Sequence, residues 1–316
     1  MLRGRMLERG ASASSQSSQS STPKLAGPAV VKMLVGPDSR EFILSRKLLA
    51  SCRYFRQRLD SAPVDFGKGG QPQLVMRLED QCPDMFELFA YWIDTRRNFD
   101  RYIDAAEARR ACEELHWDLV NLHLFAAQID APALQDCAMD AIQDVYLRRN
   151  WDINPRLVAY VYTSCDPQES CRLRKWIVAM TAWTLDGAAA ADGMADGIHL
   201  LFERCPDFWA EYHTHTRKMA RSGLEGHFKN PQLRLPSNHL RNEERQFGFR
   251  QCSFHTHRST VGQGRCPHVV SFSPLVSSPY TDGYVESDSD RAESRFGSRI
   301  VSPTSDTIPE SDLETP

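Results

Sequence analysis

Val30-Val-Lys-Met-Leu-Val35 and the helical pattern that follows it decide the fold of this 316-residue chain. The apolar run stops at Gly36-Pro37, which predicts a strand and a turn, and residues 40–44 predict the returning strand of a hairpin. A helix is predicted next, because apolar side chains recur at helical spacing on one face: Leu48, Cys52, Phe55 and Leu59, widened by Leu49. The sequence therefore predicts a β-hairpin followed directly by an amphipathic helix.

The rest of the middle of the chain predicts one more strand and a series of helices. A Gly/Pro-rich loop over 62–72 precedes a strand over 74–78, and Asp84 is expected to cap a helix that buries Phe86 and Phe89. Asp118 is expected to cap the next helix, which is followed by one that starts at Pro132. Three further helices are predicted over 155–165, 168–185 and 206–221, with 187–193 as a loose connector.

Both ends of the chain lack the apolar content of a core. Residues 1–28 are rich in serine and are predicted to be disordered, because such a tract cannot bury enough apolar area to offset its ordering entropy. Regularity is expected to end at Ser222, with a basic segment over 222–272. Residues 273–316 form an acidic tail with plausible phosphorylation sites at its Ser-Pro pairs, and this tail is also predicted to be disordered.

Composition excludes some classes of protein. Apolar residues make up 41% of the chain and charged residues 25%, which is enough for a buried core, and the net charge of −3 indicates no overall attraction to nucleic acid or anionic membranes. No apolar run is long enough to span a membrane. The N-terminus lacks the apolar core of a secretory signal, and its arginines and serines only weakly suggest a mitochondrial transit peptide. Nine cysteines, an odd number, predict reduced thiols and hence the cytoplasm or nucleus.

The order of these elements resembles a BTB/POZ domain. The resemblance rests on an ordered series of segments, closest to the fungal type with an appended helical region: residues 30–35, 41–55, 75–80, 85–93 and 119–128. It covers residues 29–147, and the segments at 170–176 and 205–209 are similar to the helical extension of those proteins, placed here at 148–221. The resemblance implies an α+β fold in which a three-stranded sheet is flanked by helices, followed by an all-α extension.

The resemblance also implies protein–protein interaction, since members of this family commonly self-associate. Some present substrates to a cullin-type ubiquitin ligase and others recruit transcriptional regulators. This chain has Pro28-Ala29 in place of the family's Asp before the first strand, and Arg46-Lys47 in place of its His-Lys. It also lacks the hydrophobic-x-Glu element of cullin-binding members over 59–65, so corepressor recruitment and ligase adaptor activity are not favoured, although the adaptor remains an alternative.

No motif in the sequence predicts catalysis. A phosphate-binding glycine loop, a nucleophile elbow and a His-Glu-x-x-His helix are all missing. Cys52 and Cys137 lie on apolar helix faces, where a small buried side chain is the usual interpretation. His116 and His123 are expected to be half-buried beside aromatic rings. The chain is therefore predicted not to be an enzyme.

One cluster of cysteine and histidine residues has the composition of a metal-binding site. Five Cys or His residues lie within residues 252–268, where the composition of the chain predicts about one. Cys252, His255, His257 and Cys266 form a Cys2His2 set suited to tetrahedral zinc, with both histidines on one side of an extended segment, two glycines that let Cys266 return, and His268 as a spare. The competing interpretation is a flexible tail with incidental thiols. Zinc is the only cofactor that the sequence suggests.

A basic stretch precedes this cluster and provides the alternative function. Phosphates would bind its positive charges and bases would stack on Phe247 and Phe249, which describes a zinc-dependent regulator that contacts nucleic acid through 217–268. A solvated helix end and linker is the more common cause of such a stretch. The basic residues are Arg217, Lys218, Arg221, Lys229, Arg234, Arg241, Arg245 and Arg250.

The favoured interpretation is a non-enzymatic interaction module that acts as an adaptor or scaffold. Its partners are expected to be other proteins, including further copies of itself bound through the BTB/POZ domain, while nucleic acid is not favoured and a membrane is not expected. Binding is expected to rest on a few large anchors near the end of the first long helix, namely Tyr54, Phe55 and Arg58.

Overall fold

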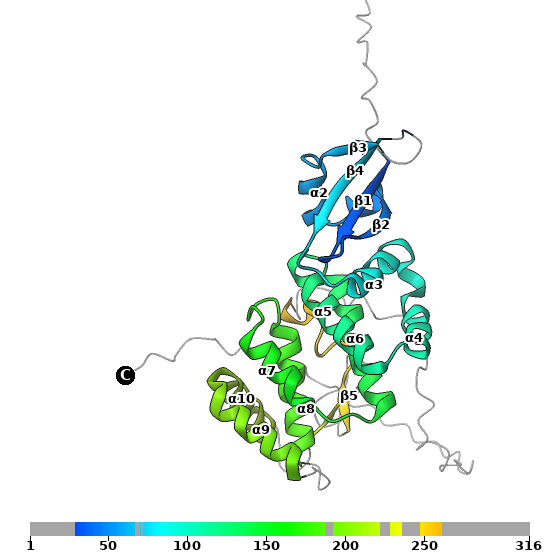
Figure 1. Ribbon diagram of the computed structural model, residues 1–316. Coiled ribbons are helices and arrows are strands. Elements are labelled where there is room, and N and C mark those ends of the chain that lie inside the picture. Colours follow the sequence, from blue (N-terminus) through cyan, green and yellow to red (C-terminus); the bar gives the residue numbers. More distant parts are fainter. Residues whose placement is uncertain are drawn as a thin grey trace, which may run out of the picture. The chain divides into compact units, whose positions relative to one another are not determined.

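The computed structural model describes residues 29–66, 70, 72–186, 192–221, 228–235 and 247–260 (Figure 1). All of them belong to one compact unit, Met1–Ser271. The fold is α+β, with a mixed four-stranded sheet and its helices at the N-terminal side and a mostly helical region after it. The tails predicted to be disordered, 1–28 and 273–316, lie outside the described residues, and none of the described helices has the length and apolar content needed to span a membrane.

The sheet has the strand order β2-β1-β4-β3. Strand β1 (Val30–Val35) pairs antiparallel with β2 (Arg40–Ser45), which confirms the predicted hairpin, and parallel with β4 (Pro72–Leu78). Strand β3 (Val64–Phe66) pairs antiparallel with β4. The expectation of a three-stranded sheet is therefore wrong by one strand, because part of the predicted 62–72 loop is extended and forms ladder hydrogen bonds along β4.

The turn after β1 requires a glycine. Gly36 has a φ of +76°, a conformation that side chains disfavour, and a Cβ at this position would lie 2.7 Å from Cγ of Pro83. Its amide donates to the carbonyl of Leu78 at 2.9 Å, so the hairpin turn is bonded to the end of β4. The turn thus brings the hairpin, β4 and the start of the next long helix together.

The predicted first helix is two short helices, α1 (Arg46–Leu49) and α2 (Arg53–Leu59). The chain tightens after Leu48 into turns with i→i−3 hydrogen bonds, and Cys52 is extended, with φ −90° and ψ 127°. The continuous helix was therefore a wrong prediction. Its buried face is confirmed, since Leu49, Cys52, Phe55 and Leu59 are buried and Leu48 is half-buried.

An aromatic cluster joins these short helices to the longer ones behind them. Phe55 of α2 packs on Phe89 of α3 (Pro83–Asp94), and Phe89 packs edge-on against Phe125 of α5 (Cys112–Gln128) at 5.4 Å. Helix α5 packs in turn along α6 (Pro132–Arg149). Phe55 and Phe89 have no exposed surface, so this cluster forms the centre of the N-terminal core.

Two elements between α3 and α5 were not predicted, the 3-10 turn η1 (Arg96–Asn98) and helix α4 (Phe99–Arg109). Helix α5 also starts seven residues earlier than expected, at Cys112. Asp118 is therefore inside the helix and not its cap, and its carboxylate lies 3.1 Å from the guanidinium of Arg110. Burial, the largest influence, raises the pKa of Asp118 to about 6 in spite of that arginine.

The helical region continues the same core. It contains α7 (Pro155–Thr163), α8 (Cys171–Asp186), α9 (Asp192–Arg204) and α10 (Pro206–Arg221). Three of these were predicted, and α9 occupies residues that were left as a connector or unassigned. One continuous set of buried apolar residues runs from Val31 to Phe254, so packing does not stop at residue 147, where the BTB/POZ resemblance ends.

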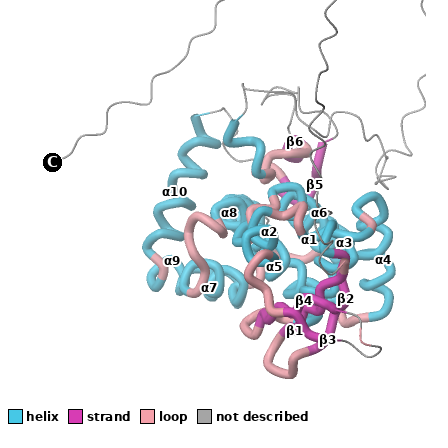
Figure 2. The backbone as a smooth tube through the Cα atoms, turned by 90° about the horizontal axis from the view of Figure 1, so that it is seen from above, coloured by secondary structure: helices cyan, strands magenta, loops and turns pink. Residues whose placement is uncertain are grey.

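The segment after residue 222 is partly ordered, contrary to expectation. Strand β5 (Asn230–Leu235) pairs with β6 (Gly248–Arg250), and the 3-10 helix η2 (Thr256–Thr260) follows. Strand β5 packs on α6 and α8, away from the N-terminal sheet, and the helices lie between the two sheets (Figure 2). The prediction of a segment without a core was wrong, because α6 and α8 offer it a surface.

Candidate metal centre and contact surfaces

Three of the four predicted metal ligands converge. The ligand atoms of Cys252, His255 and His257 all lie within 4.8 Å of one another. Cys252 and His255 have no exposed surface, and 20% of the His257 side chain is exposed. The fourth predicted ligand, Cys266, and the spare His268 lie outside the described residues. A thiol and two imidazoles are ligands that a zinc-type cation prefers.

The backbone reaches this arrangement by turns and not by the extended segment that the sequence suggested. The amide of His255 donates to the carbonyl of Cys252 at 3.2 Å, and the amide of Arg258 donates to the carbonyl of His255 at 3.2 Å. Successive i→i−3 turns bring side chains three residues apart to the same side of the chain. Cys252 and His255 meet for this reason, and His257 joins them from the first turn of η2.

An acidic stripe on helix α6 lies against the cluster. It consists of Asp136, Asp140 and Asp144. Because these residues are four apart, they lie on one face of the helix. Asp136 accepts from the amide of Thr256 at 2.7 Å and lies 3.2 Å from Nδ1 of His257. Asp140 lies 2.9 Å from Nε2 of His255. Both histidines are therefore oriented by carboxylates of α6.

Arg234 of β5 binds the same acidic stripe. Its guanidinium pairs with Asp140 and lies 2.5 Å from the carboxylate of Asp144, and only 14% of its side chain is exposed. Burial favours a raised pKa at Asp140, but the charge of Arg234 and the hydrogen bond to His255 outweigh it, and the pKa is lowered. At Asp144 burial prevails over Arg234, and the pKa is raised. Arg234 and His255 together thus outweigh burial at Asp140, whereas Arg234 does not outweigh it at Asp144.

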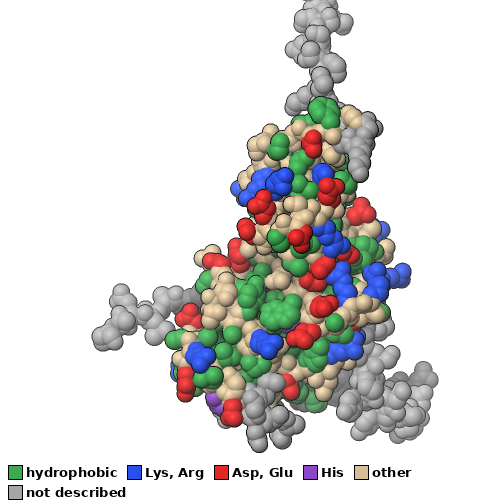
Figure 3. Space-filling view, viewed as in Figure 1, with side chains coloured by type: hydrophobic (Ala, Val, Ile, Leu, Met, Phe, Trp, Pro, Cys, Tyr) green, Lys and Arg blue, Asp and Glu red, His purple; other side chains and the backbone are tan. Residues whose placement is uncertain are grey.

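These contacts also change the interpretation of the basic stretch. Arg234 is committed to Asp140 and Asp144, and Lys229 is 3% exposed, so neither offers its charge to a phosphate backbone. Arg217, Lys218 and Arg221 of α10 are exposed, whereas Arg241 and Arg245 lie outside the described residues. Phe247 is 75% exposed, but Phe249 packs against Phe254 at 5.1 Å. The face in Figure 3 carries acidic and basic side chains side by side.

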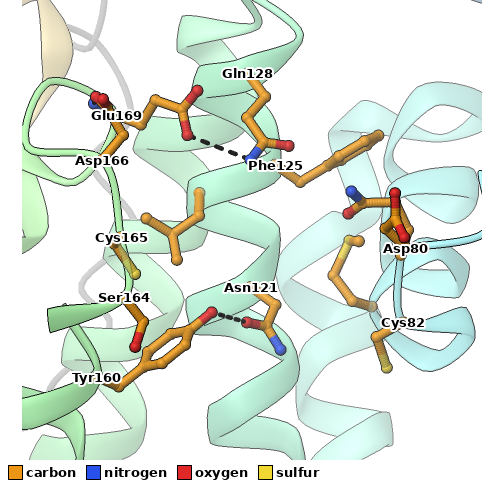
Figure 4. A pocket seen from close by; sticks show the side chains of 13 residues that line it. Asp80, Cys82, Asn121, Phe125, Gln128, Tyr160, Ser164, Cys165, Asp166 and Glu169 are labelled. Atoms are coloured by element: carbon orange, nitrogen blue, oxygen red, sulfur yellow. Dashed lines mark hydrogen bonds between the residues drawn. The ribbon is translucent and has the colours of Figure 1, made fainter.

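A separate groove of about 360 Å³ lies between α5, α7 and the loop after β4 (Figure 4). Its polar side chains are bonded to each other, Tyr160 to Asn121 at 3.3 Å and Gln128 to Glu169 at 3.2 Å. Burial raises the pKa of the Cys165 thiol in this groove, which keeps it protonated and weakly nucleophilic at neutral pH. The groove therefore offers hydrogen-bonding groups, and its Cys165 thiol is not activated as a nucleophile.

The two helical histidines are more deeply buried than expected. His116 is 2% exposed and its Nε2 lies 3.3 Å from the hydroxyl of Tyr146. His123 is 1% exposed and contacts both the carbonyl oxygen and the side-chain amide of Gln135. Burial is the main reason that the pKa of each is lowered to about 4. The half-buried placement is therefore corrected, and both imidazoles are neutral structural groups at neutral pH.

The three residues predicted to contact a partner differ in their exposure. Phe55 is completely buried in the aromatic cluster, which removes it from the contact surface and corrects that choice. Tyr54 is half-buried, and the guanidinium carbon of the exposed Arg58 lies 3.6 Å from the centre of its ring. Tyr54 and Arg58 therefore remain a surface pair on α2 (cation–π contact).

Sequence reasoning missed exposed apolar side chains at the edge of the sheet. Val64 and Phe66 of β3 are 53% and 70% exposed, and Ile43 of the opposite edge strand β2 is 57% exposed. Val64 and Phe66 were missed because residues 62–72 were predicted to form a loop. Sequence reasoning also missed the acidic stripe, although aspartates at i, i+4 and i+8 lie on one face of a helix and indicate partners opposite them.

Comparison with known proteins adds no assignment to this geometry. No protein-family model, curated protein or solved structure matches the chain.

Proposed function

We propose that this protein is a non-enzymatic protein–protein interaction module, an adaptor or scaffold that self-associates through a BTB/POZ domain at residues 29–147. The order of elements supports the proposal. A β1–β2 hairpin, two short helices, strand β4 parallel to β1, helix α3 and the α5–α6 pair follow one another in the order that the resemblance implies. The segments that carry the resemblance do not include strand β3 or helix α4.

The observation that carries the proposal is Phe66, 70% exposed on an edge strand. Among the described residues, β3 pairs with β4 alone, so its outer edge presents backbone donors and acceptors beside two exposed apolar side chains. Such an edge is a template for pairing with another chain. Large aromatic side chains that become buried on association are typical anchors of protein interfaces. The β3 edge, defined by Val64 and Phe66, is therefore the proposed contact surface.

The test is the association state of the full chain. Sedimentation equilibrium over a wide concentration range is expected to show a reversible dimer for the wild type and a monomer for Phe66→Asp. The matched control is Leu200→Asp, which places the same charge at an apolar residue of α9 that is 45% exposed. A wild-type monomer at all concentrations, or equal loss of dimer in both variants, would contradict self-association through this edge.

The two alternatives receive less support. A nucleic-acid regulator needs the positive charges of 217–268, and Arg234 and Lys229 are withdrawn from solvent. The ligase adaptor needs the cullin-binding element, and residues 59–65 contain the end of α2 and the start of β3 without it. The nucleic-acid alternative keeps the exposed Arg217, Lys218 and Arg221 in its favour, whereas the ligase adaptor has no observation in its favour among the described residues.

A further inference from the structure

We infer that Cys252, His255 and His257 form a structural site for a zinc-type divalent cation, which fastens the segment 247–260 onto helix α6. The site is independent of the proposed interaction function. It rests on the convergence of three ligand atoms within 4.8 Å, on the carboxylates behind them, and on the charge of their surroundings.

The spacing of the ligand atoms is close to that of a bound site. Bond lengths of about 2.3 Å to sulfur and about 2.0 Å to nitrogen in a tetrahedron place ligand atoms roughly 3.4–3.6 Å apart. The observed limit of 4.8 Å therefore exceeds the bound separation by little more than 1 Å.

The carboxylates of α6 determine which ring nitrogen of each histidine is available to bind the cation. An ionised carboxylate only accepts hydrogen bonds, so Nε2 of His255 donates to Asp140 and Nδ1 of His257 donates to Asp136. The proton on one ring nitrogen leaves the lone pair on the other. This pattern assigns Nδ1 of His255 and Nε2 of His257 as the ligating nitrogens. A carboxylate behind a metal-binding histidine is the usual arrangement in protein zinc sites.

The charge around the cluster also suits a divalent cation. Asp136, Asp140 and Asp144 face the segment, and two guanidinium groups contact the same region, Arg234 on the aspartates and Arg172 at 3.1 Å from the carbonyl of Thr256. On the side of α6 the ligands therefore face carboxylates, which favours a cation in a region from which water is largely excluded.

The position of the site indicates its role. All three ligands belong to one short segment, and the groups that orient them belong to α6, more than 110 residues earlier in the chain. A bound cation would hold the turns of 251–257 in the shape that presents His255 and His257 to α6. Because metal binding adds to folding free energy, removal of the cation is expected to loosen this segment first.

The experiment uses the full chain, purified under reducing conditions, with its zinc content measured by elemental analysis and its ligands probed by cobalt substitution. We expect about one zinc per chain, and a tetrahedral cobalt spectrum with a thiolate charge-transfer band. Cys252→Ala and His257→Gln are expected to lose both signals. Their matched controls are Cys112→Ala and His213→Gln, of which the first is half-buried and the second exposed, both away from the cluster.

A second measurement separates loss of metal from loss of fold. Asp136→Asn keeps the three ligands, so Asp136 is a positioning residue, and the variant should bind zinc 10- to 100-fold more weakly while its far-ultraviolet circular dichroism is unchanged. Chelation of zinc from the wild type should accelerate hydrogen exchange in 247–260 but not in the β1–β2 hairpin. The inference is overturned if the wild type binds neither zinc nor cobalt, or if Cys252→Ala and His257→Gln bind as much metal as their controls.

Discussion

Replacement of Arg234 by methionine tests whether the segment after residue 228 is part of the folded body. The Arg234 side chain is 14% exposed, and its guanidinium pairs with Asp140 and Asp144 of α6, whose side chains are 23% and 26% exposed. Methionine keeps the apolar part of the side chain and removes the charge. The variant therefore leaves two partly buried carboxylates without their common counter-ion.

The magnitude follows from the burial of these groups. At an effective dielectric constant of about 20, charges about 4 Å apart attract by about 4 kcal/mol, and removal of one partner of a buried pair costs about 3–5 kcal/mol. For a body of this size that loss corresponds to a Tm lower by about 10 °C. We expect Asp144→Asn to cost less than about 1 kcal/mol alone, and to restore about 1–2 kcal/mol in the Arg234→Met background, because it removes one unpaired charge.

Urea unfolding followed by tryptophan fluorescence gives the free energies, and hydrogen exchange of 228–235 shows where protection is lost. Arg101→Met is the matched control, since Arg101 is exposed on α4. A loss for Arg234→Met within about 0.5 kcal/mol of that control would refute the reasoning. So would the absence of any coupling between Arg234→Met and Asp144→Asn, because the two residues are in direct contact.

Two further predictions concern the N-terminal turn and the response to pH. Gly36→Ala should lower the free energy of unfolding by at least about 1 kcal/mol more than Gly70→Ala, as measured by urea unfolding. Both residues have a positive φ (76° and 71°), but only at Gly36 would the added Cβ clash with a neighbour. Equal losses in the two variants would contradict the clash. His116, His123 and His215 each have a pKa of about 4 in the folded chain against 6.5 when unfolded, so the unfolded state binds three more protons between these values and stability falls on acidification. Asp118 opposes this by one proton, since its pKa of about 6 exceeds 3.8, which leaves about 2.7 kcal/mol per pH unit from these four groups between pH 4.5 and 6. His116→Phe should reduce the slope by about 1.4 kcal/mol per pH unit in unfolding free energies measured across the range, and an unchanged slope would show that His116 does not contribute to it.

The sequence alone determined the elements whose pattern is local. The β1–β2 hairpin follows from an apolar run and a Gly-Pro turn, and the buried face of Leu49, Cys52, Phe55 and Leu59 follows from helical spacing. Both signals depend on residues within one or two turns of each other. The composition of 252–268 likewise singled out Cys252, His255 and His257 before their convergence was known.

Tertiary contacts decided the rest, because those elements are stabilised from far away in the chain. Strand β3 is only three residues long and is extended because β4 offers it a ladder of hydrogen bonds. The 247–260 segment has too few apolar residues to fold alone. It is ordered because the acidic stripe of α6, more than 110 residues earlier, binds its two histidines. Local pattern shows which side chains a segment offers, but only the three-dimensional fold shows which groups they meet.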